Sequence, residues 1–260
     1  MIIHDIEQGS PEWFAVRAGI PTASEFHRIV KPGGEVRYKK NGDPYKSSAG
    51  ELADGRWTYL YELATERLLG ESKQSLDGLQ WVERGKMLEP DAVSHYEFTR
   101  SRKTAKAGFI TPDHAKWGCS PDRLVIGADT DPLGGLEIKC PSAPKHLEYF
   151  IDGPGTNYRC QVQGCLLTSG FEFWDFQSYH PQLPEVLIRF ERDETFIGLL
   201  QAGLEQFCAE LDEVVAKIKE AGYVPTPGKF DGPTDVAARD WAWEGSDAIE
   251  AILAAGSFGG

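Results

Sequence analysis

The chain has 260 residues, of which 41% are hydrophobic and 26% are charged. This composition is typical of globular proteins and excludes a wholly disordered or fibrous chain, and the length fits one domain with appendages. No window approaches the roughly 18 consecutive apolar residues of a membrane span, and no basic segment followed by an apolar one opens the sequence. We therefore expect a cytoplasmic protein that does not bind membranes. The five cysteines form no C-x-x-C pair and are expected to be reduced thiols.

The formal net charge of −13 is unevenly distributed along the chain. Residues 1–150 hold 20 Lys and Arg against 22 Asp and Glu, whereas residues 151–260 hold 7 against 18. An acidic protein is, at face value, a poor partner for phosphates, because nucleic-acid binders usually carry a basic surface. The near-neutral first part still permits a local basic surface that the net charge conceals.

The N-terminal third contains signals for two short helices and one basic loop. Ser10 and Pro11 are typical of a helix start and predict a helix over 11–18. Thr22 with Glu25 three residues later has capping-box spacing and predicts a second short helix. The stretch 31–48 is rich in Gly, Pro and Lys and reads as a loop. The sequence leaves open whether this loop is merely solvated or contacts phosphates.

Longer periodic segments follow. Apolar residues at helical spacing predict helices over 50–69, 79–99, 157–168 and 193–221. Short runs rich in β-branched and aromatic residues predict strands over 106–110, 123–126, 136–140, 171–179 and 186–191. The first three strands, separated by turn residues such as 129–135, are expected to form an antiparallel meander. We expect a folded domain over 1–221, followed by a linker and acidic tail over 222–260.

Three residues on two of the predicted strands suggest a chemical function. Asp122 begins one strand, and Glu137 and Lys139 lie on the next. The two-residue period of a strand puts Glu137 and Lys139 on one face and turns Ile138 into the core. Two carboxylates at a strand edge suit Mg²⁺, which prefers oxygen ligands. A neighbouring lysine can hold an attacking water during phosphodiester hydrolysis.

The spacing of these residues resembles the signature of the PD-(D/E)xK nuclease superfamily. Further motifs, in the same order, resemble the lambda-exonuclease type of YqaJ viral recombinase nucleases over residues 6–220. They are Trp13-Phe14-x-x-Arg17-x-Gly19-Ile20-x-Thr22-Ala23-Ser24-Glu25, Gly85-Lys86-x-x-Glu89, Cys119-Ser120-Pro121-Asp122, Leu136-Glu137-Ile138-Lys139-Cys140-Pro141 and Gln161-Val162-Gln163. The resemblance implies an α/β (α+β) restriction-endonuclease-like core, in which a central mixed sheet is flanked by helices.

The resemblance also assigns roles to individual residues. It implies metal ligation by Asp122, Glu137 and the Ile138 carbonyl, and positioning of the attacking water by Lys139. It implies an additional acidic residue at the metal centre and a glutamine that orients the site, which are Glu89 and Gln161. It further implies a 5′-phosphate pocket, which is formed by Arg17, Ser24 and Ser120. It also implies an apolar wedge that splits the duplex end, which is Val82.

At the level of function, the resemblance implies a Mg²⁺-dependent 5′→3′ exonuclease, with Mn²⁺ able to substitute. Such enzymes digest one strand of duplex DNA from its end and leave a 3′ single strand. They form homotrimeric rings around DNA and work with a single-strand annealing protein in phage-type recombination. The resemblance therefore also implies a phage or prophage gene product in a bacterial cytoplasm.

Other interpretations of the same residues are weighed beside these. Asp122 can cap a turn, Glu89 can be a surface carboxylate, Gln161 a buried hydrogen-bonding side chain and Arg17 a surface ion-pair partner. A structure-selective or site-selective endonuclease on the same core would cut closed circular DNA. A non-catalytic DNA-end-binding module would bind without metal-dependent product.

Overall fold

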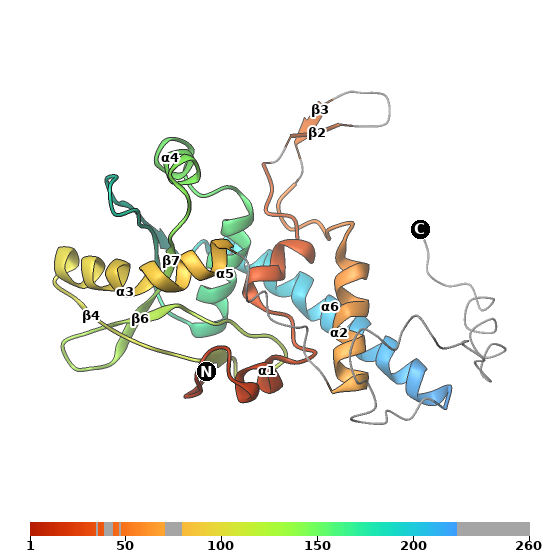
Figure 1. The fold of residues 1–260 in the computed structure, drawn as a ribbon. Coiled ribbons are helices and arrows are strands. Elements are labelled where there is room, and N and C mark those ends of the chain that lie inside the picture. The colour runs from red at the N-terminus through yellow and green to blue at the C-terminus, as the bar shows by residue number, and fades with distance from the viewer. Residues whose placement is uncertain (35, 39–43, 47, 71–79, 223–260) are drawn as a thin grey trace.

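The protein contains a five-stranded mixed sheet in the strand order β4-β6-β7-β8-β9. In Figure 1 this sheet lies on the left, and α2 (Arg56–Leu69) and α6 (Glu194–Glu220) lie on the right. The computed structural model describes residues 1–34, 36–38, 44–46, 48–70 and 80–222. Neighbouring strands are antiparallel except β7 and β8, which are parallel. The strands are β4 (Lys103–Ala105), β6 (Arg123–Ile126), β7 (Pro132–Lys139), β8 (Phe173–Ser178) and β9 (Val186–Glu191).

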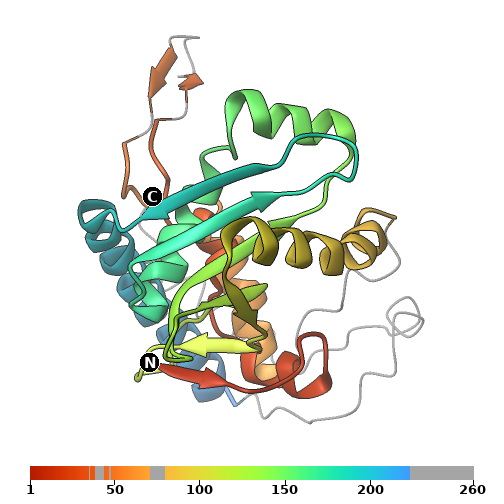
Figure 2. The ribbon, with the colours of Figure 1, turned by 90° about the vertical axis from the view of Figure 1, so that its left-hand side faces the viewer.

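Helix α3 (Gln80–Arg100) lies across one face of this sheet (Figure 2). Its Ala92 and Tyr96 pack against sheet residues in a small apolar cluster, whose other members are Val125, Leu136 and Ile138. The Tyr96 hydroxyl donates a hydrogen bond of 2.6 Å to the buried Asp175 carboxylate on β8. Helix α3 is therefore held on this face by apolar packing and by the hydrogen bond to the buried carboxylate.

The opposite face carries the main core, which extends well beyond the sheet. It is formed by η1 (Ala23–Arg28), α2 (Arg56–Leu69), α5 (Asn157–Ser169) and α6 (Glu194–Glu220), packed against sheet residues such as Leu124 and Trp174. Gly164 on α5 lets η1 approach closely, since an added Cβ there would overlap the ring of the fully buried Phe26. This approach sets the position of the chain segment that contains Ser24.

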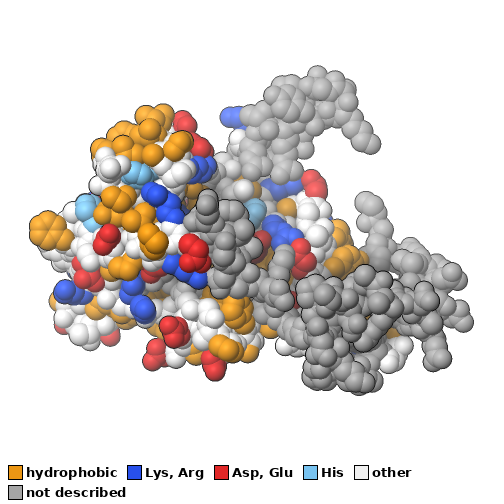
Figure 3. All heavy atoms as spheres, in the orientation of Figure 1, with side chains coloured by type: hydrophobic (Ala, Val, Ile, Leu, Met, Phe, Trp, Pro, Cys, Tyr) orange, Lys and Arg blue, Asp and Glu red, His pale blue; other side chains and the backbone are white. Residues whose placement is uncertain are grey.

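The parallel pairing of β7 and β8 requires a crossover connection. The crossover contains α4 (Ala143–Asp152) and α5. No sequence-based prediction covers α4, which exposes the apolar side chains of Leu147, Phe150 and Ile151 (Figure 3). Immediately before α4 lies the end of β7, so the crossover starts next to Lys139.

The remaining elements are a short helix, a two-stranded sheet and a hairpin, most of them from the N-terminal part of the chain. Helix α1 spans Pro11–Arg17, and β1 (Ile2–His4) pairs with β5 (Phe109–Thr111) in a separate two-stranded sheet. A hairpin of β2 (Val36–Tyr38) and β3 (Pro44–Lys46) projects from the body of the molecule (Figure 1). Within the described ranges, no helix is both long and apolar enough to cross a membrane.

The predicted mixed sheet flanked by helices is confirmed, but several local predictions are wrong. The strand expected over 106–110 is present only in part, as β5, and residues 106–108 connect β5 to β4, which belongs to a different sheet. The chain turns between them at Gly108, where an added Cβ would overlap the Ile6 carbonyl oxygen. Of the expected three-strand meander, the antiparallel pairing of β6 with β7 is confirmed, but β5 pairs with β1 rather than with β6.

Two helix predictions also need correction. The helix expected over 50–69 begins only at Arg56, because Gly50 has a φ of +85° and Leu52 forms a bridge with Val30. The capping box at Thr22 is absent: the following element is a 3₁₀ helix whose cap makes no side-chain hydrogen bond. The tail over 223–260 and parts of the basic loop over 31–48 lie outside the described residues.

The close approach at Gly164 predicts a measurable cost for the smallest substitution. Gly164→Ala should lower the free energy of unfolding by about 1–3 kcal/mol, because the added methyl group overpacks against Phe26. Gly198→Ala on the exposed side of α6, where an added Cβ meets nothing within 4 Å, should instead raise it by about 0.5–1 kcal/mol. Urea unfolding measures both. Equal effects of the two substitutions would contradict the packing argument.

Candidate active site

The structure brings the predicted carboxylates together where β6 and β7 separate. Asp122 immediately precedes β6, whose first residue Arg123 pairs with Leu136 of β7. Beyond that pair, the main-chain N–H of Ile138 donates to Asp122 Oδ2 at 2.6 Å instead of to a strand neighbour. The Asp122 side chain thus takes the place of a main-chain acceptor of β6 and lies against the C-terminal part of β7.

Glu137 lies on the sheet face that α5 covers and is only 3% exposed. Its Oε1 accepts hydrogen bonds from Lys139 Nζ, two residues along the same face, and from Gln161 Nε2 on α5 at 2.9 Å. Ile138 packs on the other face of the sheet. The predicted alternation of these three residues along the strand is therefore confirmed.

Enclosing two acids so close together has an electrostatic cost. Burial, together with the charge of Glu137, raises the pKa of Asp122 to about 7. Burial alone would lower the pKa of Lys139, but the charges of Glu137 and Asp122 outweigh it and raise that pKa. At neutral pH Lys139 is therefore a charged ammonium group, and Asp122 is only partly ionised.

The free oxygens at this edge suit a small divalent cation. Among the described residues, neither Asp122 Oδ1 nor Glu137 Oε2 receives a hydrogen bond. The Ile138 carbonyl points to the same edge of β7 as the Ile138 N–H, toward Asp122, because both groups of a strand residue face one side. Two carboxylate oxygens and a carbonyl are the ligand types that Mg²⁺ prefers, and a cation here would also offset the acid pair.

Glu89 does not complete a three-carboxylate cluster. It lies on α3, and its Oε1 is 3.6 Å from the guanidinium of Arg123. In the part of the chain that the structure describes, no three His, Cys, Asp or Glu side chains gather in a group that could hold a metal ion. The charge of Glu89 also raises the pKa of Asp122, but less than burial and the charge of Glu137 do. It lines the same cleft as Asp122.

Arg17 and Ser120, both predicted phosphate ligands, are in direct contact. Arg17 ends α1, and its NH1 donates to Ser120 Oγ at 2.7 Å. The guanidinium lies 3.9 Å from the ring centroid of Trp13, whose indole N–H donates to Ser120 Oγ at 3.1 Å and to the Gly108 carbonyl at 3.0 Å. Burial lowers the pKa of Arg17, although an arginine remains charged. Because Ser120 is two residues before Asp122, this pocket adjoins the carboxylate edge.

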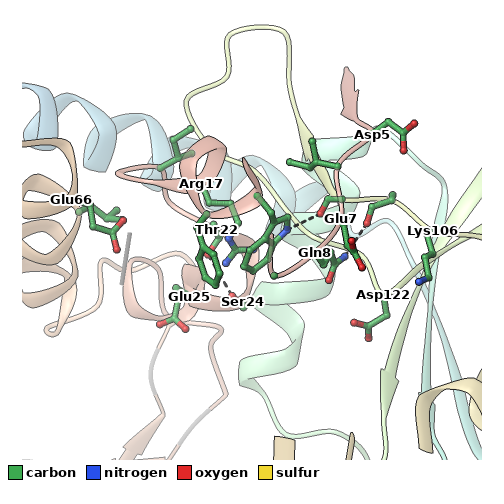
Figure 4. A pocket seen from close by; sticks show the side chains of 18 of the residues that line it. Asp5, Glu7, Gln8, Arg17, Thr22, Ser24, Glu25, Glu66, Lys106 and Asp122 are labelled. Atoms are coloured by element: carbon green, nitrogen blue, oxygen red, sulfur yellow. Dashed lines mark hydrogen bonds between the residues drawn. The ribbon is translucent and has the colours of Figure 1, made fainter. Parts of the chain in front are cut away.

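One cleft connects the two groups of residues (Figure 4). Its volume is about 1090 Å³, and its lining includes Arg17, Ser24, Glu89 and Asp122. Ser24 lies on η1, with its hydroxyl 3.4 Å from that of Thr22. The side chain of Val82, the predicted wedge, lies outside the described residues. The predicted residues that the structure describes therefore gather around one cleft and the strand edge beside it.

Sequence reasoning missed one residue that organises the cleft. Gln8 Nε2 donates to the Pro121 carbonyl at 2.7 Å and to the Ala107 carbonyl at 2.9 Å. It thereby fixes the main chain next to Asp122 to the segment between β4 and β5. No local signal marks Gln8, since its partners are about a hundred residues away in the chain.

Comparisons with known proteins agree with this geometry. A family model described as the YqaJ-like viral recombinase domain matches residues 12–172. The crystal structure of an alkaline exonuclease (LHK-Exo) from Laribacter hongkongensis is similar, with 30% sequence identity and a TM-score of 0.66. That similarity covers 82% of this chain and 98% of that one. The structure of LHK-Exo in complex with dAMP matches with the same identity and coverage and a TM-score of 0.67.

A phage-related exonuclease from Haemophilus somnus 129PT shares the fold. Its TM-score is 0.56 at 17% identity, covering 76% of this chain and 96% of that one. The comparison with curated proteins finds no match.

The raised pKa of Asp122 predicts a pH-dependent stability in metal-free buffer. The folded protein binds the Asp122 proton more tightly than the unfolded chain, so this carboxyl group costs stability as the pH rises from about 4 to 7. Asp122→Asn removes that cost and retains an acceptor for the Ile138 N–H. In EDTA at pH 8, this variant should be more stable than the parent by about 1–2 kcal/mol.

Urea unfolding at pH 4 and pH 8 measures the difference, which should vanish at pH 4. Asp129→Asn, at an exposed turn, is the matched control and should change stability little at either pH. A parent protein more stable than Asp122→Asn at pH 8 would contradict the electrostatic account.

Proposed function

Since the chain belongs to the YqaJ-like viral recombinase family, we propose that it is a Mg²⁺-dependent 5′→3′ exonuclease acting on one strand of duplex DNA. The observation that carries the proposal is the proximity of two parts. The Asp122 and Glu137 carboxylates lie at a strand edge with Lys139, and the Arg17–Ser120 pocket begins two residues away. A hydrolytic centre beside a phosphate pocket is the arrangement that an end-dependent nuclease requires.

We assign the cation to Asp122, Glu137 and the Ile138 carbonyl, with Glu89 as an additional acidic residue of the same cleft. When bound, Mg²⁺ polarises the phosphodiester and offsets the charge that develops during hydrolysis. Mn²⁺ accepts the same oxygen ligands and is proposed to substitute. Gln161 holds Oε1 of Glu137 and so directs its other oxygen away from α5.

Lys139 acts as a hydrogen-bond donor in this proposal. In the metal-free protein, the charges of Glu137 and Asp122 raise the pKa of Lys139 and keep Nζ protonated. A charged ammonium group can orient the attacking water and stabilise negative charge on its oxygen. Glu137 holds Nζ in place through their mutual contact on one strand face.

Arg17, Ser24 and Ser120 are proposed to bind the 5′-phosphate of the strand that is digested. The guanidinium offers a rigid set of donors, and the hydroxyls add two more. Trp13 holds the guanidinium by stacking, so little side-chain freedom remains to be lost when phosphate binds. A pocket for a terminal phosphate selects DNA ends and gives the 5′→3′ direction.

The remaining assignments follow from the family resemblance. They are a homotrimeric ring around DNA, Val82 as the wedge at the duplex end, a single-strand annealing protein as partner, and action in a bacterial cytoplasm. The uneven charge is compatible with a ring, in which an acidic exterior would disfavour DNA binding outside a less acidic channel.

End-labelled DNA tests the activity itself. With Mg²⁺, the protein should release 5′-labelled mononucleotides early, leave a 3′-labelled strand and spare a covalently closed circle, and EDTA should abolish all product. Lys139→Ala should reduce the rate by at least about 10³-fold while DNA binding persists, because it removes the donor at the reacting centre. Lys103→Ala, which neutralises an exposed lysine of β4, should retain full activity.

Other outcomes identify the rival functions. A cut circle would favour the endonuclease, and binding without product would favour the DNA-end-binding module. Near-parental activity of Lys139→Ala would refute its assigned role.

Arg17→Ala tests the phosphate pocket. Single-turnover rates on 5′-phosphorylated and 5′-hydroxyl duplexes should differ strongly for the parent and converge for the variant, with a loss of about 10-fold to 100-fold on the phosphorylated end alone. Equal slowing on both ends would show that Arg17 supports the fold rather than the phosphate. Circular dichroism checks that the variant is folded, since Arg17 also packs on Trp13.

A further inference from the structure

The cleft that joins the two proposed sites has more acids than cations in its lining, although its substrate would be a polyanion. Its carboxylates are Asp5, Glu7, Glu25, Glu62, Glu66, Glu89 and Asp122, and its cations are Arg17, Arg28, Lys86 and Lys106. Repulsion between this lining and DNA phosphates must be offset by cations that are not already neutralised. The partners of the four cations therefore decide where a phosphate can bind.

Three of these cations already have protein partners. Arg28 forms a two-point ion pair with Glu62 at 2.9 and 3.0 Å, and Lys86 lies 3.9 Å from Glu83. Arg17 donates only to the neutral Ser120 hydroxyl, and its charge is the one assigned to the terminal phosphate. Lys106 makes no hydrogen bond or ion pair with any residue in the described part of the chain, and its side chain is exposed. Its positive charge is available to a ligand.

The main chain that follows Lys106 is held by two side chains. The Ala107 carbonyl accepts from Gln8, which also binds the Pro121 carbonyl beside Asp122. The Gly108 carbonyl accepts from Trp13, which stacks on the Arg17 guanidinium. Lys106 therefore directly precedes main chain that contacts both proposed sites, through Gln8 and through Trp13. Figure 4 shows Lys106 on the same side of the view as Asp122.

We propose that Lys106 binds an internal phosphate of the DNA strand in the cleft, separate from the terminal phosphate at Arg17. This assignment rests on the proposed function, because it takes DNA as the ligand. A lysine that contacts phosphate contributes affinity that does not depend on sequence and weakens as salt rises. Lys106 therefore sets the strength with which the cleft binds DNA, and the Arg17 pocket sets the preference for a phosphorylated end.

Fluorescence anisotropy in EDTA tests this binding without any need for cleavage. Labelled duplexes with 5′-phosphate or 5′-hydroxyl ends are titrated between 50 and 200 mM salt. Lys106→Ala should weaken binding about fivefold to tenfold on both ends at low salt, and should reduce the slope of log K against log salt by about 0.9. Lys106→Arg should bind like the parent. Lys103→Ala, on an exposed lysine outside the cleft lining, is the matched control and should change neither quantity.

Affinity and salt slope of Lys106→Ala equal to those of Lys103→Ala would overturn the assignment. So would a loss confined to 5′-phosphorylated duplexes, which would place Lys106 in the terminal pocket. Adding Mg²⁺ to the same duplexes tests the nuclease separately. A parent protein that binds DNA but does not cleave it refutes the proposed function, and the affinities of Lys106→Ala and the parent can still be compared. A parent protein that binds neither duplex overturns both.

Discussion

The hydrogen bond from the Ile138 N–H to Asp122 Oδ2 determines the architecture of the site. It forms where the β6–β7 ladder stops, after the Arg123–Leu136 pair. A strand partner at this position would have used the N–H and the carbonyl of Ile138 and closed the edge. Because a side chain takes the N–H instead, the carboxylate lies beside β7 and the carbonyl next to it faces the same space. The oxygen atoms proposed as cation ligands thus come together because the β6–β7 strand pair ends here.

This edge is electrostatically costly in the absence of a cation. Glu137 is compensated by Lys139 and Gln161, whereas Asp122 has one main-chain donor and a raised pKa. The fold tolerates the cost because the surrounding elements are held independently. On the α3 face, the buried Asp175 is fully paired by Tyr96 and by two hydrogen bonds from Arg189. Stability lost at the site is the free energy that binding of a cation would recover.

The sequence predicted the parts of the site that depend on local periodicity. Strand alternation placed Glu137 and Lys139 on one face and Ile138 on the other, because a two-residue period needs no tertiary information. Long-range contacts could not be predicted in this way. Gly108, which lies against Ile6, interrupts the strand predicted over 106–110, and Gln8 reaches its two carbonyl partners across about a hundred residues. Family motifs identified Glu89, but its distance from the other acids depends on how α3 crosses the sheet.

The joining of the two proposed sites through α1 bears on the choice between an exonuclease and an endonuclease. Trp13 contacts Arg17 and Ser120, and Ser120 precedes Asp122 by two residues, so the phosphate pocket and the strand edge form one unit. A terminal phosphate monoester carries nearly two negative charges, whereas an internal diester carries one. A pocket built on the Arg17 guanidinium would therefore favour the end of a strand, and under the proposed function the fixed spacing to Asp122 would present the next phosphodiester for hydrolysis. Release of that nucleotide would create a new terminal phosphate, which the same pocket would bind.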